Sequence, residues 1–339
     1  MGRWIRRFLV LAVLVIGATA FGLWWSHRWL QQPIAQLTQP VIFDVPRGAS
    51  LRAVAADLHQ RGLLTQPQVW ILWARVNGRS AALKAGEYQL MPGVTPDSLL
   101  QQLSSGAVLL HSITFIEGST FADIRGLMSR NESVRLTLQN ATPEDVMREL
   151  GEPGMHPEGQ FFPDTYHFAR GTTDREILAI AHRRMQDELR AAWDNRAGDL
   201  PLAGSYEALI LASIVEKETA LDTERPLIAG VFVERLRRGM RLQTDPTVIY
   251  GMGAAYDGNI RRTDLVTDTP YNTYTRAGLP PTPIALPGLD SLRAAVNPVS
   301  NGAIFFVATG KGDGSHYFSA TLGEHEAAVQ RYLHKLKQR

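Results

Sequence analysis

The segment from Tyr206 to Ala220 places one carboxylate among apolar neighbours. Its apolar residues recur with helical spacing, and side chains advance about 100° per residue around a helix. On that wheel Glu218 lies about 20° from Leu211 and about 40° from Ile214, in the middle of the apolar stripe. Glu216 lies about 160° away from Glu218, so we expect it to be a solvated or structural acid.

A carboxylate among aliphatic side chains is costly to ionise, because burial removes the water that stabilises its charge. Desolvation should therefore raise the pKa of Glu218 and make this residue a proton donor near neutral pH. A general acid needs that property. The alternative is that Glu218 ends the helix at the mouth of a cleft and pairs with an arginine such as Arg225 or Arg235.

Two later stretches are rich in groups that hydrogen-bond to sugars. One runs from Met240 to Gly251, and the other runs from Pro270 to Ile284. Amides, hydroxyls and tyrosines on loops offer many oriented hydrogen bonds and flat rings that fit under a pyranose. Ordinary turn composition is the alternative for each stretch. The candidate binding residues are Gln243, Thr244, Asp245, Tyr250, Asn272, Thr273 and Tyr274.

The composition excludes several other kinds of chemistry. The chain has 339 residues and no cysteine, which excludes a disulfide scaffold, a zinc–thiolate site and a cysteine nucleophile. The nine histidines show no H-E-x-x-H spacing; His316 and His325 are expected to be structural or surface groups, and no metal site is predicted. Removing the four N-terminal arginines leaves 31 basic against 33 acidic residues. A nucleic-acid ligand is therefore not expected.

The N-terminal region contains an uncharged apolar run of eighteen residues, Phe8–Trp25. As a helix this run is roughly 27 Å long, close to the ~30 Å hydrocarbon core of a bilayer. Arginines precede it, and positive flanks stay in the cytoplasm. We expect residues 1–7 in the cytoplasm, residues 8–26 in the membrane and the rest outside. The alternative is a signal peptide cleaved after Ala20, although the apolar run continues past that residue.

The chain beyond a linker at residues 27–40 is expected to form two α+β parts. The first, residues 41–110, has expected strands at 41–45 and 85–90 and helices at 51–61, 66–76 and 97–104. The second, residues 111–339, has expected strands at 113–116, 304–307 and 317–319. Its expected helices are 121–129, one opened by Thr142 and Pro143, then 174–196, 206–220, 224–238 and one at the C-terminus. Residues 242–287 are expected to be loops.

The sequence resembles the endolytic murein transglycosylases, also called the YceG-like family. The resemblance lies in ASIVEKET at 212–219, RLQTDPTVIYG at 241–251 and YNTY at 271–274. Glu158 begins a further matching motif, EGQFFPDTY, and GLPP at 278–281 fits as well. The resemblance covers essentially the whole chain. It implies an inner-membrane anchor, a LysM-like module at 41–110 and a YceG-like catalytic domain at 111–339.

This resemblance implies cleavage of peptidoglycan between N-acetylmuramic acid and N-acetylglucosamine, within the glycan strand. In the family the catalytic acid is the second glutamate of the E-K-E run, here Glu218. It would protonate the glycosidic oxygen and then act as a base on the 6-hydroxyl of the same muramic residue, which leaves a 1,6-anhydro end. No metal or organic cofactor is required. Asp245 would stabilise positive charge or orient Gln243 and Thr244, and Glu158 is a further candidate.

Two other functions remain open from the residues. A muramidase-type hydrolase would use Asp245 or Glu216 with a water, and a glycan-binding scaffold of the cell-wall machinery would need no acid. The resemblance also implies nascent strands as substrate, termination of strand elongation as the role, and penicillin-binding peptidoglycan synthases as partners. The expected location is the bacterial inner membrane, with a single pass, a cytoplasmic N-terminus and a periplasmic catalytic domain.

Overall fold

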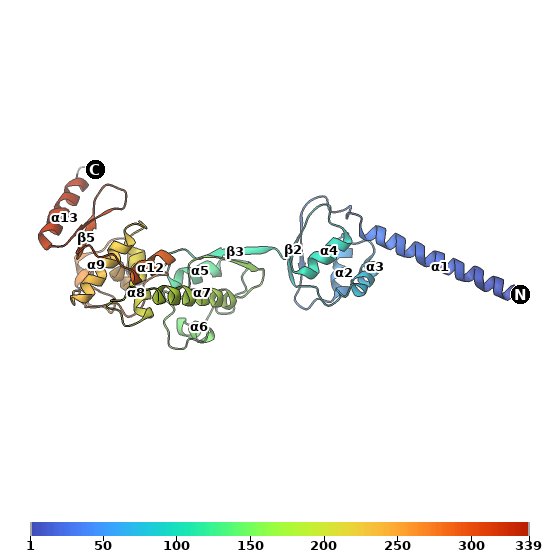
Figure 1. Ribbon diagram of the computed structural model, residues 1–339, viewed down its shortest axis with the longest axis horizontal. Helices are drawn as coiled ribbons and strands as arrows, with labels where there is room; N and C mark the ends of the chain where they lie inside the picture. The colour runs from blue at the N-terminus through green and yellow to red at the C-terminus, as the bar shows by residue number, and fades with distance from the viewer. Residues whose placement is uncertain (1, 338–339) are drawn as a thin grey trace. The chain divides into compact units, whose positions relative to one another are not determined.

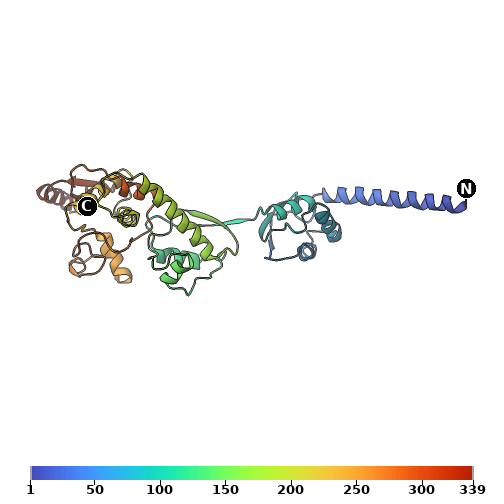
Figure 2. The ribbon, with the colours of Figure 1, turned by 60° about the horizontal axis from the view of Figure 1, so that its bottom comes forward.

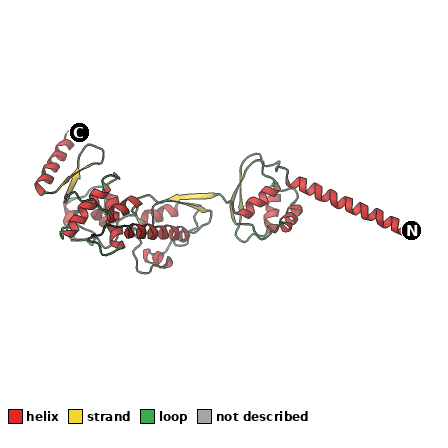
Figure 3. Cartoon of the chain, viewed as in Figure 1, coloured by secondary structure: helices red, strands yellow, loops and turns green. Residues whose placement is uncertain are grey.

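The computed structural model describes residues 2–337 and divides into two compact units. The first contains the chain up to His111 together with Phe168–Gly171, and the second contains Ser112–His167 and the chain from Thr172 onward. Helices predominate in the described residues, and the strands there form three separate two-stranded sheets (Figure 3). The fold is therefore a mixed helix-and-sheet fold, as predicted.

Helix α1 (Arg3–Leu30) is long and apolar enough to cross a membrane. Figure 1 shows it as a single long helix at the N-terminal end of the chain. Its apolar side chains, such as Phe8 and Leu14, are exposed. The helix continues through residues 27–30, where the sequence predicted a linker. The reason is that Leu30 is buried in the core of the first unit, so tertiary packing extends the last turn of the helix.

The rest of the first unit is a small α+β body. Its elements are β1 (Val41–Val45), α2 (Leu51–Gln60), α3 (Pro67–Val76), β2 (Gly86–Leu90) and α4 (Pro96–Ser105). Strands β1 and β2 are antiparallel and place Phe43 opposite Tyr88. Both rings are buried with Trp70 in the core. The hydroxyl of Ser50 accepts a hydrogen bond from the amide of Ala53, so it caps α2 as predicted.

The second unit holds most of the helices. Strands β3 (Leu110–Thr114) and β4 (Thr165–Ala169) each have residues in both units. The other elements of the second unit are α5 (Phe121–Ser129), α6 (Pro143–Glu149), α7 (Asp174–Asp194), α8 (Ser205–Glu218), α9 (Arg225–Arg237), α10 (Asp245–Met252), the 3-10 turn η1 (Gly253–Ala255), α11 (Arg262–Val266), α12 (Leu289–Val296), β5 (Phe305–Ala308), β6 (His316–Ser319) and α13 (Leu322–Leu336). Strand β3 pairs with β4, and β5 pairs with β6 in an antiparallel hairpin. Threonines at 120 and 142 cap α5 and α6 through capping boxes.

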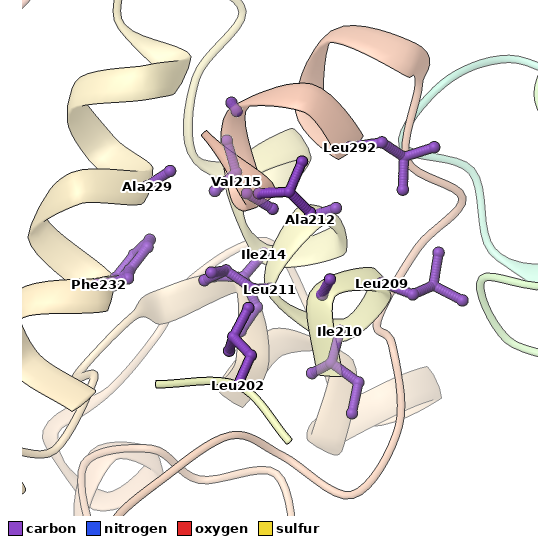
Figure 4. Close-up of a cluster of buried hydrophobic side chains, with 14 of the residues drawn as sticks. Leu202, Leu209, Ile210, Leu211, Ala212, Ile214, Val215, Ala229, Phe232 and Leu292 are labelled. Atoms are coloured by element: carbon purple, nitrogen blue, oxygen red, sulfur yellow. The ribbon is translucent and has the colours of Figure 1, made fainter. Parts of the chain in front are cut away.

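Helix α8 is the centre of the second unit. Every residue from Ala208 to Val215 is buried, and α7, α9 and α12 pack around it (Figures 1 and 2). Figure 4 shows Leu211 and Ile214 of α8 near Phe232 of α9, with Leu292 of α12 on another side of the helix. The middle of the helix is therefore buried on every side. The single apolar stripe assumed from the sequence underestimates how much of it is buried.

Several elements differ from the sequence prediction. Helices α10 and α11 lie within residues 242–287, which were predicted to be loops, and α12 and β4 were not predicted. The helices missed have five to eight residues, so each spans at most about two turns and gives little periodic signal. Strand β3 begins three residues earlier than predicted. Its limits are set by pairing with β4, a contact between distant residues.

Candidate active site

Glu218 is the last residue of α8 and lines a cleft of the second unit. The helix ends two residues earlier than predicted, because Thr219 adopts an extended backbone. The Glu218 side chain is partly exposed, and the cleft volume is about 490 Å³. The lining residues are Glu218, Arg235, Leu242, Gln243, Asp245, Tyr274, Phe305, Phe306, Val307, Leu322, His325 and Val329.

The surroundings of Glu218 favour its protonated form. Burial raises the pKa of Glu218 to about 7, the hydrogen bond from Thr244 opposes this shift, and the charge of Asp245 adds to it. Oε1 of Glu218 accepts that hydrogen bond from the Thr244 hydroxyl. Among residues 2–337, no Lys, Arg or His forms an ion pair with Glu218, and Arg225 pairs instead with Glu216 and aspartates. The alternative of an ion pair at Glu218 is therefore wrong.

Three predicted residues lie where the loop before α10 meets that helix: Gln243 and Asp245 line the cleft, and Thr244 is buried. Gln243 has φ +52°, and it is the one non-glycine residue of the described chain with a positive φ. Such a conformation is costly and persists where other contacts hold it. Here the Gln243 amide donates to the carbonyl of Thr273 at 3.2 Å, and Oε1 accepts from Arg235 at 3.2 Å. This reversal places Thr244 against Glu218 and Asp245 in the cleft wall.

The YNTY segment supports that loop from behind and contributes one tyrosine to the cleft. The Thr244 amide donates to the hydroxyl of Thr273 at 3.1 Å. The side-chain amide of Asn272 donates to three backbone carbonyls, the shortest contact being 2.7 Å to Thr267. Asn272 and Thr273 are buried, so they position the loop and cannot reach a ligand. The Tyr274 hydroxyl donates to Oδ1 of Asp245 at 2.6 Å, within the cleft.

Two further predicted residues, Glu158 and Tyr250, also lie outside the cleft lining. Glu158 is 3% exposed. Its Oε1 accepts from the amide of Phe121 at 2.9 Å, and its Oε2 accepts from the Tyr250 hydroxyl at 3.1 Å. Burial raises the pKa of Glu158 to about 7. The Tyr250 ring packs edge-on against Tyr271. Through its two hydrogen bonds, Glu158 links Tyr250 of α10 to Phe121 at the start of α5.

Glu216 is structural, and the part of the prediction that allowed it to be solvated is wrong. Its Oε2 accepts from the amide of Gly288 at 3.0 Å and from the hydroxyl of Ser291 at 2.7 Å. These groups belong to the N-terminus of α12, where a negative charge is stabilising. Arg225 lies 3.8 Å from the other carboxylate oxygen. Glu216 is therefore fully engaged by protein groups and cannot activate a water.

Several cleft residues were not identified as site residues from the sequence. Arg235 was considered only as an ion-pair partner, and His325 was interpreted as a structural or surface group. Leu322, His325 and Val329 line the cleft from α13. They are spaced by three and four residues, which puts them on one face of a helix. That spacing was visible in the sequence, but nothing local indicated which surface this face would meet.

The sequence was compared with protein families and with known proteins, and the matches cover most of the chain. The profile of the YceG-like family matches residues 43–331. The chain belongs to the YceG-like family. It is 29% identical to an endolytic murein transglycosylase of Bacillus subtilis (strain 168) over 339 residues, which is 95% of this chain and 91% of that protein. It is also 26% identical to an endolytic murein transglycosylase of Streptococcus pneumoniae (strain D39), matching 96% of this chain and 64% of that relative.

A solved structure agrees with the family assignment. The crystal structure of a yceG-like protein from Listeria monocytogenes is similar to this YceG-like chain with a TM-score of 0.53 and 27% identity. The match covers 85% of this chain and 98% of that one. The similarity in sequence and the similarity in fold therefore extend over the same large part of the molecule.

The raised pKa of Glu158 should make the stability of this YceG-like protein depend on pH. Its folded pKa of about 7 lies above the ordinary value of 4.5, so the stability it contributes is present below pH 4.5 and is lost as the pH rises through 7. In Glu158→Gln the amide can accept from Phe121 and donate to Tyr250. We expect this variant to be more stable than the wild type at pH 8, by about 3 kcal/mol at most, and equal to it at pH 4.5.

The measurement is hydrogen exchange of the α8 amides at both pH values, because α8 is the core of the second unit. Exposed Glu132, changed to Gln, is the matched control and should leave the pH dependence unaltered. An equal loss of protection in Glu158→Gln and wild type between pH 4.5 and 8 would contradict the prediction.

Proposed function

We propose that this protein is an endolytic lytic transglycosylase of peptidoglycan, a lyase that cleaves the β-1,4 bond between N-acetylmuramic acid and N-acetylglucosamine. The observation that carries the proposal is Glu218, a carboxyl group with a pKa of about 7 in an open cleft. A group with that pKa can both give and take a proton near neutral pH. The relatives named endolytic murein transglycosylases support the choice of substrate.

The proposed reaction uses Glu218 twice. Its proton moves to the glycosidic oxygen as the bond from that oxygen to C1 of the muramic residue breaks. The 6-hydroxyl oxygen of the same residue then bonds to C1 and gives its proton to the Glu218 carboxylate. Protons balance, and neither water nor a cofactor enters. The carboxylate of Asp245 lies in the same cleft, where its charge stabilises the positive character at C1.

A muramidase is the second candidate, since Asp245 shares the cleft with Glu218. It would place a water at C1 and leave a reducing end, whereas the proposed reaction leaves a 1,6-anhydro end. The test is digestion of purified peptidoglycan by the full chain in detergent, followed by mass spectrometry of the new ends. Anhydro ends are lighter by the mass of one water. Reducing ends alone would refute the transglycosylase assignment and support the hydrolase.

The family resemblance suggests a role for each part of the chain. Residues 41–110 would be a LysM-like module that binds N-acetylglucosamine-containing glycan, and residues 111–339 the catalytic domain. Cutting nascent strands beside a penicillin-binding peptidoglycan synthase would terminate their elongation. Helix α1 supports a single-pass anchor, with residues 1–7 in the cytoplasm and the domains in the periplasm of a bacterial cell.

The absence of cysteine from the chain allows the orientation to be tested directly. Gly198 is exposed with open space at its Cβ position, and Gly2 lies before α1. In intact spheroplasts we expect a membrane-impermeant thiol reagent to label Gly198→Cys and not Gly2→Cys. Detergent should make both sites reactive. Labelling of Gly2→Cys alone in intact spheroplasts would show the opposite orientation.

A further inference from the structure

One wall of the Glu218 cleft comes from the C-terminal part of the chain. Strand β5 contributes residues 305–307 to the cleft, and α13 contributes Leu322, His325 and Val329. The strand and the helix pack against each other (Figure 1). The side chains of this wall are apolar except for His325, and Arg235 of α9 lies beside the wall against the Phe305 ring. The proposed chemistry at Glu218 uses neither group. The hydrogen bonds of Arg235 to backbone carbonyls and to Gln243 hold the loop, but they do not account for its uncompensated charge or for His325.

Arg235 is a buried cation with no anion beside it. It is 7% exposed, and its Nε and Nη1 donate to the carbonyls of Ile304 at 2.7 Å and Leu242 at 2.9 Å. Within residues 2–337 no carboxylate lies within 4.0 Å of the guanidinium, and Nη2 donates to no described group. By contrast, the equally buried Arg225 has Glu216 and two aspartates around it. Because an unpaired buried charge is costly, Arg235 has an unused capacity for an anion.

His325 lies next to this cation and offers a hydrogen-bond donor. Its ring stacks on Phe305 with centroids 5.0 Å apart and planes at 18°, and the Arg235 guanidinium carbon lies 5.2 Å from the centre of the Phe305 ring. Nδ1 of His325 is buried without a hydrogen-bond partner. Burial and then the charge of Arg235 lower the pKa of His325. Because Nδ1 is enclosed, Nε2 is the ring nitrogen that can donate a hydrogen bond toward the cleft that His325 lines.

We propose that Arg235 and His325 form a carboxylate-binding subsite for the substituent on the muramic residue. This inference rests on the proposed function, since it assumes a peptidoglycan strand in the cleft. Two donors, one of them charged, match a carboxylate, which only accepts hydrogen bonds. The muramic substituent offers this group either as its own lactyl carboxylate or as the carboxylates of an attached stem peptide. The subsite would distinguish muramic acid from N-acetylglucosamine, which has no such substituent.

The test measures binding in a background that does not cut the ligand. Full-length Glu218→Gln in detergent is compared with Glu218→Gln/His325→Phe, because phenylalanine keeps the stack on Phe305 and removes the donor. Four probes are used: strands with stem peptides, strands without peptides and thus with free lactyl carboxylates, the latter strands after amidation, and neutral chitin oligosaccharides. His325→Gln in the same background is the conservative variant, since it retains a donor.

We expect His325→Phe to weaken binding about tenfold for at least one carboxylate probe and less than twofold for the amidated and chitin probes. His325→Gln should recover most of the loss. A loss on peptide-free strands identifies the lactyl carboxylate, and a loss on peptide-bearing strands alone identifies the stem peptide. Equal effects on charged and neutral probes, or no effect on any, would overturn the subsite.

Digestion of peptidoglycan by the unmodified protein, run in parallel, keeps the two proposals separable. Cleavage without carboxylate selectivity leaves the enzyme assignment intact and removes the subsite. Carboxylate-selective binding without cleavage refutes the enzyme assignment and keeps the subsite.

Discussion

Glu218→Gln is expected to abolish glycan cleavage while leaving the fold and the affinity for glycan unchanged. Glutamine cannot donate an acidic proton to the glycosidic oxygen or accept one from the 6-hydroxyl. Because general acid–base catalysis contributes about 10² to 10⁴ to a rate, and this residue acts in both halves of the reaction, we expect a loss of about 10³-fold or more. The measurement is the yield of anhydro ends from purified peptidoglycan.

The fold should survive because the amide oxygen of glutamine can accept the hydrogen bond from Thr244 as the carboxylate does. The variant also loses a carboxyl group that is costly to ionise, so its stability at pH 8 should equal or exceed that of the wild type. Glu132→Gln, at an exposed position, is the control for the loss of one carboxylate. An anhydro-end yield equal to the wild type would exclude Glu218 as the acid and leave the glycan-binding scaffold as the better function.

The parts of the fold that could be predicted from sequence are those fixed by neighbours along the chain. Ser50, Thr120 and Thr142 precede helices that begin where predicted, because a cap bonds to an amide within three residues. The β5–β6 hairpin was also predictable, because its two strands are neighbours along the chain and pair with each other. Helices α10 and α12 were not, since each is short and gains its stability from packing against α8.

The helical wheel explains only part of why Glu218 lies at the cleft. Its place on the wheel among Leu211 and Ile214 does put it in line with buried side chains. However, α8 is buried all round, so the wheel alone would not separate it from Glu216. What separates them is the partner each one meets. Glu216 reaches the N-terminus of α12, and Glu218 reaches the end of α8, where the chain turns away and the cleft begins.

The rest of the site depends on contacts that no local pattern encodes. The positive φ of Gln243 is held by Thr273 and Arg235, which lie 30 residues after it and eight residues before it. The cleft wall at His325 comes from the last helix of the chain. Residues that hydrogen-bond to sugars and residues that position a loop have the same side-chain types. Sequence alone therefore could not show that Tyr274 lies in the cleft and Asn272 behind it.

Asp245→Asn is expected to lower cleavage about 10²-fold at pH 7, because two effects act in the same direction. The first is loss of the negative charge near C1, where electrostatic stabilisation of a transition state is worth about that factor. The second acts through Glu218, whose pKa is raised by the charge of Asp245. Removing that charge lowers the pKa of Glu218, so a smaller fraction of the acid is protonated at pH 7.

The second effect gives a pH profile that separates the two candidate reactions. For a transglycosylase, the fall of kcat/KM at high pH should move to lower pH in Asp245→Asn, and the remaining products should still have anhydro ends. Tyr274→Phe keeps the charge of Asp245 and removes one hydrogen bond to it, so its profile should stay near that of the wild type. Asp268→Asn, outside the cleft, is the charge control. If Asp245 were the base that activates a water, Asp245→Asn would remove cleavage at every pH, and the wild-type products would carry reducing ends.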